Sequence, residues 1–285
     1  MKGAFYWSVR RELWEHRSVW LAPLAVAAFV IVASFVAATG HVQKAGNLSA
    51  LPPEKLQQIV MMPLSIATSV VIVLAFIVAA FYCLDALNGE RRDRSVLFWK
   101  SMPVSDATTV LSKAFVPLVI TPALAFAIAL VTQLLLFIPM AAFFKAVGAD
   151  IGPVVAGLPL ATMAVVLLYG VVVHSLWFAP IFALFLLASV AVRRPLLWVL
   201  IPAIVVQVLE RIAFGTQYTT TFIKYRIAGA MGEAFAPGAM TGPVASLSQL
   251  DPARFAMSPG LWLGLAAAAA FLFIAIRLRR SKEPL

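Results

Sequence analysis

The sequence is poor in charged residues and contains a single cysteine. Only 12% of its 285 residues are Asp, Glu, Lys or Arg, against roughly 25% in ordinary soluble domains. A chain that is 62% hydrophobic cannot cover its surface with polar groups, which excludes a soluble globular protein and indicates a lipid environment. The cysteine, Cys83, lies in an apolar run, so a disulfide or a cysteine metal cluster within the chain is excluded. Cys83 is predicted to be an inert buried thiol.

The sequence also lacks the patterns of common catalytic sites. It contains no G-x-x-x-x-G-K-[ST] phosphate-binding loop and no serine in a nucleophile-elbow pattern. Its histidines, His16, His41 and His174, are expected at different sides or depths of a membrane, so they cannot share a metal ion. We therefore predict that the chain is not an enzyme, has no metal site and binds no cofactor itself.

Long apolar runs dominate the sequence instead. They predict an all-α polytopic membrane protein with one transmembrane domain over residues 1–285. Residues 1–17 mix aromatic and charged side chains, which is typical of an interfacial helix. A cleaved signal peptide is rejected, because the first apolar run is too long and its flank carries acidic residues. Six runs are predicted to cross the bilayer: residues 20–38, 63–84, 115–137, 162–188, 195–213 and 261–276.

The fourth of these runs is unusually long. Residues 154–192 form an apolar stretch of 39 residues, which could hold two crossings or one long, kinked crossing. Two crossings would place Arg193 and Arg194 outside the cell. We therefore predict one crossing with an interfacial segment before it and a kink at Pro180.

Smaller signals predict where other helices begin, bend or end. Ser105 and Asp106 form a plausible N-cap for the helix that becomes the third crossing. Pro117 and Pro122 predict a bend or a pause in that helix. Residues 215–258 are rich in Gly, Thr and Ser and form an outer-face segment, either as re-entrant or interfacial helices or as a loosely ordered loop.

Loop charge predicts the orientation. The formal net charge is +10, and 15 of the 22 Lys and Arg residues lie in residues 1–17, 85–113, 193–194 and 277–285. Cytoplasmic loops of membrane proteins carry an excess of Lys and Arg. Both termini and residues 85–113 are therefore predicted to be cytoplasmic.

Residues 85–113 form the longest strongly charged run between two apolar segments. Glu90 stands four residues before Arg94, the favourable order for a helical ion pair. An apolar patch with Phe98 and Trp99 follows the charges. Such a loop either anchors to anionic lipid or docks on a cytoplasmic protein, and the aromatic pair with its following turn favours docking. The predicted docking residues are Glu90, Arg91, Arg92, Arg94, Ser95, Phe98, Trp99, Lys100, Pro103 and Ser105, with the aromatics buried in the partner and the charges around them as a polar rim.

This layout resembles the membrane subunit of ABC-2-type exporters. The stretch NGERRDRSVLFWKSMPVSD is similar to the coupling region of that family, in which a basic stretch led by a glutamate precedes a short hydrophobic helix and a Ser-x-Pro-x-Ser turn. The stretches HSLWFAPIFALFLLASVAVRRPLLWVLIP and VLERIAFGT resemble one bacterial branch of these permeases. The resemblance covers nearly the whole chain.

The resemblance implies a place in a larger complex. It implies a bacterial inner-membrane permease that docks on a separate nucleotide-binding subunit, which binds ATP and magnesium. A second permease chain, expected to be identical, would complete the pathway. The implied substrate is unidentified and expected to be amphiphilic or lipid-like.

Three polar residues inside the apolar runs are possible pathway residues: His174, Gln133 and Gln207. Ionisable residues inside a membrane are functional candidates by default. A neutral His174 bonded to a helix carbonyl or to Tyr169 is the structural alternative, and we favour it. A second class of function also stays open, in which the chain is a non-transporting assembly or sensor subunit that scaffolds another membrane protein.

Overall fold

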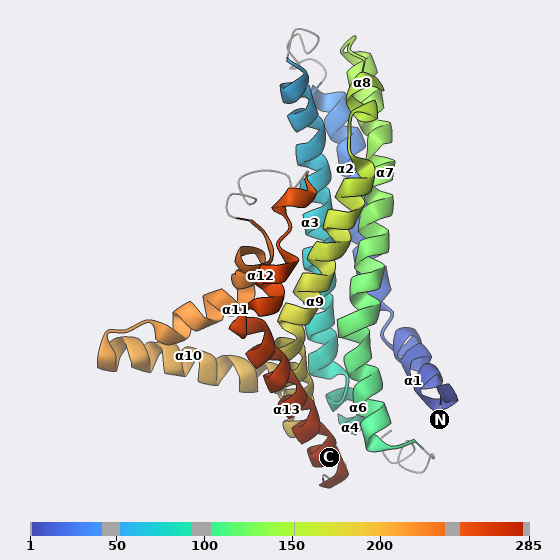
Figure 1. The fold of residues 1–285 in the computed structure, drawn as a ribbon. Helices are drawn as coiled ribbons and strands as arrows, with labels where there is room; N and C mark the ends of the chain where they lie inside the picture. Colours follow the sequence, from blue (N-terminus) through green and yellow to red (C-terminus); the bar gives the residue numbers. More distant parts are fainter. Residues whose placement is uncertain (1, 42–51, 93–103, 151, 237–245, 282–285) are drawn as a thin grey trace.

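A computed structural model gives the arrangement of the chain over residues 2–41, 52–92, 104–150, 152–236 and 246–281 (Figure 1). These residues form helices and no β-strand, apart from an isolated bridge between Phe235 and Leu250. The elements are α1 (Lys2–Glu15), α2 (Ser18–His41), α3 (Pro53–Asp85), α4 (Asn88–Arg92), α6 (Asp106–Phe115), η3 (Val116–Ile120), α7 (Thr121–Ala146), α8 (Gly152–Ala156), α9 (Leu160–Ala191), α10 (Pro195–Phe214), α11 (Tyr218–Ala234), η5 (Leu247–Gln249), α12 (Pro252–Met257) and α13 (Pro259–Ser281).

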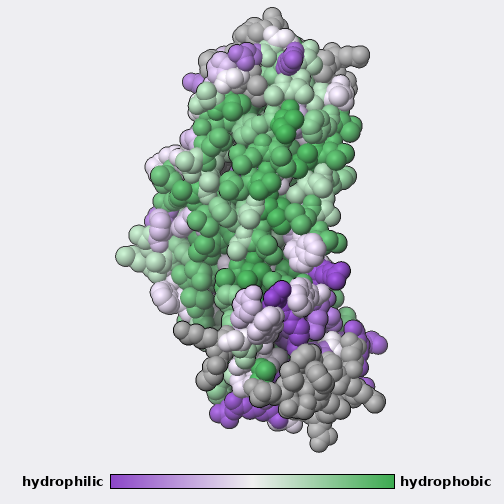
Figure 2. All heavy atoms as spheres, turned by 90° about the vertical axis from the view of Figure 1, so that its right-hand side faces the viewer, coloured by the Kyte–Doolittle hydropathy of each residue, from purple (hydrophilic) through white to green (hydrophobic). Residues whose placement is uncertain are grey.

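The prediction of an all-α protein with six membrane-crossing segments is confirmed in its coarse form. Six helical segments of the described chain are long and apolar enough to span a bilayer. Several exceed the predicted runs: α3 has 33 residues, which is roughly 50 Å of helix against a hydrocarbon core of roughly 30 Å. Hydrophobic residues cover the middle of the molecule and hydrophilic residues gather at its two ends (Figure 2). This distribution fits a bundle whose ends stand outside the hydrocarbon core.

Proline shapes the third and fourth segments. Leu160–Ala191 is one continuous helix with Pro180 inside it. The prediction of one long helical segment, and not two shorter ones, is therefore confirmed. At the start of the third segment, residues Val116–Ile120 form a π-helical turn that contains Pro117. Pro117 has no backbone N–H to donate, so the regular helical ladder is interrupted there and the predicted pause is confirmed. Ser105 caps α6 as predicted, since its hydroxyl accepts a hydrogen bond from the backbone N–H of Thr108 at 3.1 Å.

The centre of the bundle is formed by α3 and α9, with α2, α7 and α13 packed around them. One of the buried clusters between α9 and α13 consists of small residues: Ala179, Ala183 and Ala268. Small side chains let two helix backbones approach closely, which is how helices pack in a membrane without a hydrophobic driving force between them. This packing fixes α13, the last helix, against the middle of the molecule.

The helix α10 differs from the expectation for residues 195–213. It has the length and apolarity of a crossing segment, but it projects sideways from the bundle and α11 returns beside it (Figure 1). Pro195 is the one buried residue of α10. The chain reverses at Gly215, whose φ of 65° suits glycine, and Glu210 accepts a hydrogen bond from the Thr219 backbone N–H at 2.9 Å. Residues 218–234 therefore form a helix. The sequence was compatible with either a helix or a loosely ordered loop in this segment.

Both chain ends lie at the same end of the bundle as α4 and α6 (Figure 1). The connection between α7 and α8 lies at the opposite end. The segments that carry most of the positive charge therefore come together, as a common cytoplasmic location requires.

Candidate functional site

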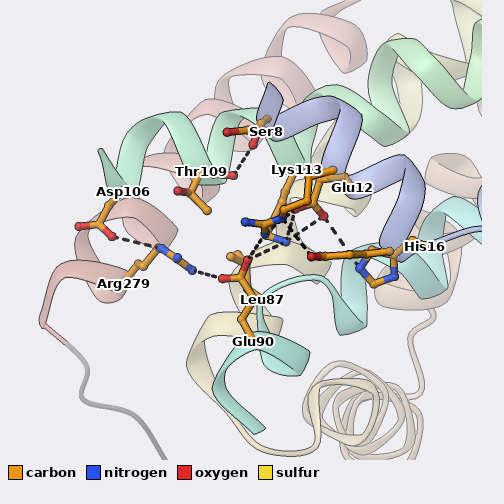
Figure 3. A network of polar contacts seen from close by, with 12 residues as sticks. Ser8, Glu12, His16, Leu87, Glu90, Asp106, Thr109, Lys113 and Arg279 are labelled. Carbon is orange, nitrogen blue, oxygen red and sulfur yellow. Dashed lines mark hydrogen bonds and ion pairs between the residues drawn. The ribbon is translucent and has the colours of Figure 1, made fainter. Parts of the chain in front are cut away.

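A cluster of buried charged side chains joins four segments at the end of the bundle that holds both termini (Figure 3). We call it the ionic cluster. Its members come from α1, α4, α6 and α13, and its two central carboxylates are Glu12 on α1 and Glu90 on α4. The charged members are Arg11, Glu12, Glu90, Asp106, Lys113 and Arg279.

Lys113 and Glu12 form the innermost pair. The Lys113 ammonium lies 2.8 Å and 2.9 Å from the two carboxylate oxygens of Glu12. Tyr82, on α3, donates its hydroxyl to the same carboxylate at 2.9 Å. The Lys113 side chain is 0% exposed and that of Glu12 is 1% exposed, so neither charge has water to stabilise it. Each depends on the other for its solvation.

Glu90 is the hub of the cluster. Its Oε1 lies 2.8 Å from Arg11 and 3.1 Å from Lys113, and its Oε2 lies 2.8 Å from Arg279. Arg279 reaches further, with its Nε 3.1 Å from Asp106 at the start of α6. Three cations thus surround one carboxylate that is only 7% exposed.

The ionic cluster pairs every one of its named charges with an opposite one. Three cations (Arg11, Lys113 and Arg279) face the carboxylates of Glu12, Glu90 and Asp106, and the more exposed Glu15 adds a further carboxylate 3.2 Å from Arg11. Burying an ion pair gives little net stability, because desolvation opposes the attraction, but removing one partner leaves the other charge buried alone. The cluster therefore acts as a set of mutually dependent contacts that specify how four segments meet.

The pKa values of Arg11, on α1, and His16, next to α1, are shifted from their ordinary values. Burial opposes the charge of Arg11, but the carboxylates of Glu12, Glu15 and Glu90 outweigh it and raise the Arg11 pKa. Burial lowers the pKa of His16, against the attraction of Glu12. Arg11 therefore stays charged, and His16 is neutral at neutral pH.

Ser189 positions the short helix that carries Glu90. Its hydroxyl, on α9, accepts hydrogen bonds from the backbone N–H groups of Leu87 at 2.9 Å and Asn88 at 2.8 Å. These N–H groups lie at the break between α3 and α4, where the helical ladder is interrupted. The bonds fix α4 against the end of α9, and so fix the direction in which Glu90 points.

Glu12, Glu15 and His16 form a group whose ligand atoms lie within 4.8 Å of one another among the described residues. Both Glu12 oxygens already interact with Lys113. A divalent cation there would have to displace the ammonium and would stand beside the guanidinium of Arg11, 3.1 Å from Glu12. The donor set therefore fits an internal ion-pair network better than a metal site.

The predicted docking residues have separate locations. Glu90 differs from the expectation of a polar rim around Phe98 and Trp99: its side chain is 7% exposed and paired with cations of its own chain. Arg92 is exposed, with its guanidinium 4.0 Å from Asp85, and Ser105 caps α6. Arg91 lies in α4. Arg94, Ser95, Phe98, Trp99, Lys100 and Pro103 lie outside the described residues.

Two of the three possible pathway residues come together and the third does not. Gln133 and His174 line the same groove between α3, α7, α9 and α11, whereas Gln207 lies on the projecting helix α10. His174 Nδ1 lies 2.7 Å from the Gly170 carbonyl, and Tyr169 donates to the Ala234 carbonyl at 3.0 Å. Of the two structural partners expected for His174, the helix carbonyl is the one present.

No sequence pattern links Glu90 to its ion-pair partners. Lys113 and Arg279 stand 23 and 189 residues after Glu90 and share no motif with it, so only folding brings the three residues together. A weak signal exists: Lys113 is a lone cation just before an apolar run, where an unpaired charge would be costly.

No protein-family model, curated protein or solved structure matches this chain.

Proposed function

We propose that this chain is the membrane-spanning permease subunit of an ATP-driven exporter of the ABC-2 type. It would couple ATP hydrolysis by a separate nucleotide-binding subunit to the export of an amphiphilic or lipid-like substrate. ATP and magnesium would bind to the partner subunit, and a second, identical permease chain would complete the pathway. The membrane would be the bacterial inner membrane, with both termini cytoplasmic.

The observation that carries the proposal is the position of Glu90 in the ionic cluster. Glu90 lies at the entry of residues 85–113 and is paired with Lys113 at their exit. It is also paired with Arg11 of α1 and Arg279 of α13, near the two chain ends. A partner that pushes on the loop would therefore move α1, α6 and α13 together.

The source of energy supports the same proposal. The sequence contains no phosphate-binding loop of the G-x-x-x-x-G-K-[ST] type, so ATP hydrolysis by that route has to come from another chain. A loop held at both of its ends by buried ion pairs is suited to receive force from such a chain. The six long apolar helices supply the membrane part.

The test is a pull-down from detergent-solubilised native membranes with an affinity-tagged chain, followed by photolabelling with 8-azido-ATP. We expect a labelled ATP-binding chain in a one-to-one ratio with the permease. The double variant Phe98→Ala/Trp99→Ala removes the predicted aromatic anchors and should lose the labelled chain. Trp198→Ala, an exposed aromatic on α10, is the matched control and should retain it. Absence of any labelled chain, or equal capture by both variants, contradicts the proposal.

One observation favours the alternative of a non-transporting subunit that scaffolds another membrane protein. The projecting helix α10 exposes a row of large apolar side chains, among them Leu200, Ile204 and Val208. Such a surface could pack laterally on another membrane protein. Cross-linking from α10 to a different membrane protein, combined with no ATP-binding chain in the pull-down, would support this alternative.

A further inference from the structure

A groove of about 310 Å³ opens between α3, α7, α9 and α11, away from the ionic cluster. We call it the bundle groove. Most of its lining is apolar and includes three flexible methionines, Met61, Met163 and Met231. Five polar residues line it as well: Ser65, Thr68, Ser69, Gln133 and His174. No Asp, Glu, Lys or Arg is among its lining residues.

The hydroxyl groups of the bundle groove have their donors occupied. Ser65 donates to the Met61 carbonyl at 2.9 Å, and Ser69 donates to the Ser65 carbonyl at 2.8 Å. Thr68 donates to the Leu64 carbonyl at 2.8 Å and accepts from Gln133 Nε2 at 2.7 Å. What the hydroxyls leave available are oxygen lone pairs, which are acceptors.

His174 and Gln133 add two further acceptors. The Gly170 carbonyl can only accept, so Nδ1 of His174 carries the proton in their 2.7 Å contact. Nε2 of the neutral ring is then an acceptor. Within the described residues, neither this atom nor Gln133 Oε1 has a hydrogen-bond partner. Neither is among the fully buried unpaired atoms, so both are accessible.

We propose that the bundle groove binds an uncharged amphiphile that donates a hydrogen bond from a hydroxyl or amide group to Gln133 and His174. The polarity of the groove selects this class: its open acceptors outnumber the one donor left, the second N–H of Gln133, which favours a ligand that donates. The lack of charged residues in the lining disfavours an ionised head group at membrane depth. The methionines and the other apolar residues would surround the hydrocarbon part. That this ligand is the exported substrate rests on the proposed function, but its binding does not.

The test uses the full chain in phosphatidylcholine nanodiscs without any ATPase. The probe is hexadecanol that carries a diazirine in its chain, and the comparison probes are its methyl ether and the matching fatty carboxylate. After irradiation, labelled peptides are mapped by mass spectrometry. We expect the alcohol to label peptides of α3 and α9 around residues 61–73 and 163–174. The ether and the carboxylate should label them roughly three- to ten-fold less, as loss of one hydrogen bond implies.

Variants tie the labelling to the two acceptors. Gln133→Leu and His174→Phe should each lower labelling by the alcohol to the level of the ether, while Gln207→Leu, the same change on α10, should not. Ser69 is exposed, so Ser69→Trp can block the groove without disturbing a buried contact and should abolish the labelling even if the other variants fold poorly.

Two results overturn the inference: equal labelling by alcohol and ether, which would show a surface that merely meets lipid, or no labelling of the groove peptides. The labelling experiment contains no ATPase, so its outcome does not depend on whether the proposed function is correct. If the pull-down captures no ATP-binding partner but the alcohol labels the groove selectively, the exporter proposal is contradicted and the ligand site is supported. If an ATP-binding partner is captured but the groove is not labelled, the exporter proposal is supported and the ligand site is contradicted.

Discussion

Lys113 shows how a single residue can depend on the fold. Its ammonium lies between the carboxylates of Glu12 and Glu90, and its side chain is 0% exposed. A free lysine would not leave water for such a position, because the cost of burying an unpaired charge is several kcal/mol. Its two partners meet it only because α1 packs against α6 and because α4 places Glu90 beside it.

Replacing Lys113 tests this dependence. Lys113→Met leaves Glu12 and Glu90 without their shared cation, and we expect a loss of about 3–5 kcal/mol in the free energy of unfolding. Thermal unfolding in detergent, followed by tryptophan fluorescence, measures it. Lys145→Met, an exposed lysine at the other end of the bundle, should change little. Adding Glu12→Gln to Lys113→Met should cost less than the two single changes together, since the carboxylate and the ammonium are one unit.

His16 gives the cluster a dependence on pH. Burial lowers its pKa, so the unfolded chain takes up a proton at a higher pH than the folded chain does. Stability is then fully present above the unfolded value of about 6.5 and is lost as the pH falls below it. We expect the melting temperature to drop on acidification through this range and His16→Phe to weaken the drop. Phenylalanine keeps the ring packed on Tyr82, whose centroid lies 4.8 Å away. An unchanged pH profile in the variant would assign the drop to other groups.

At the scale of elements, Arg226 attaches α11 to the bundle. Its guanidinium donates to the Gly260 carbonyl at 3.0 Å and to the Trp177 carbonyl, and it lies 4.6 Å from the centre of a Trp177 ring. The absence of a side chain at Gly264 makes room for it, because an added methyl group would overlap the guanidinium. Burial lowers the pKa of Arg226. One side chain thus joins α11 to α9 and α13.

Removing that side chain should release α11. For Arg226→Met we expect a local loss of about 1.5–3 kcal/mol, the range for hydrogen bonds made by a charged group. Hydrogen exchange read by mass spectrometry should show faster exchange in residues 218–234, with α3 and α9 unchanged. Lys224→Met, on the exposed side of the same helix, is the control. Equal exchange in both variants would mean that α11 is held by its apolar contacts instead.

At the scale of the whole molecule, the charge distribution and the bundle agree on one orientation. Both termini, α4 and α6 gather at one end, and 15 of the 22 Lys and Arg residues lie in the segments that meet there or next to it in the sequence. Positive charge favours the cytoplasmic side, so this end should face the cytoplasm.

Labelling with a membrane-impermeant maleimide tests the orientation. We expect Lys145→Cys to react in intact spheroplasts and Arg92→Cys to react only after the membrane is opened. The unmodified chain serves as the control, since Cys83 is 0% exposed and should stay unlabelled. Reaction of Arg92→Cys from outside would reverse the orientation and remove the basis for a cytoplasmic partner.

Local patterns in the sequence determined the class of protein and most of its helices. Apolar length predicted the six long helices, Pro117 predicted the interruption before α7, and Ser105 predicted the cap of α6. These features depend on residues close together in the chain, because backbone hydrogen bonding and proline act within one or two turns.

Tertiary structure decided what no local pattern contains. The pairing of Glu90 with Lys113, Arg11 and Arg279, and the meeting of Gln133 with His174, join residues from separate helices. The sequence predicted Glu90 in a polar rim around two aromatic residues, yet it lies buried because four segments bring their charges to one place. A charge leaves water only where its counter-charges are already held, and holding them is a property of the packed bundle.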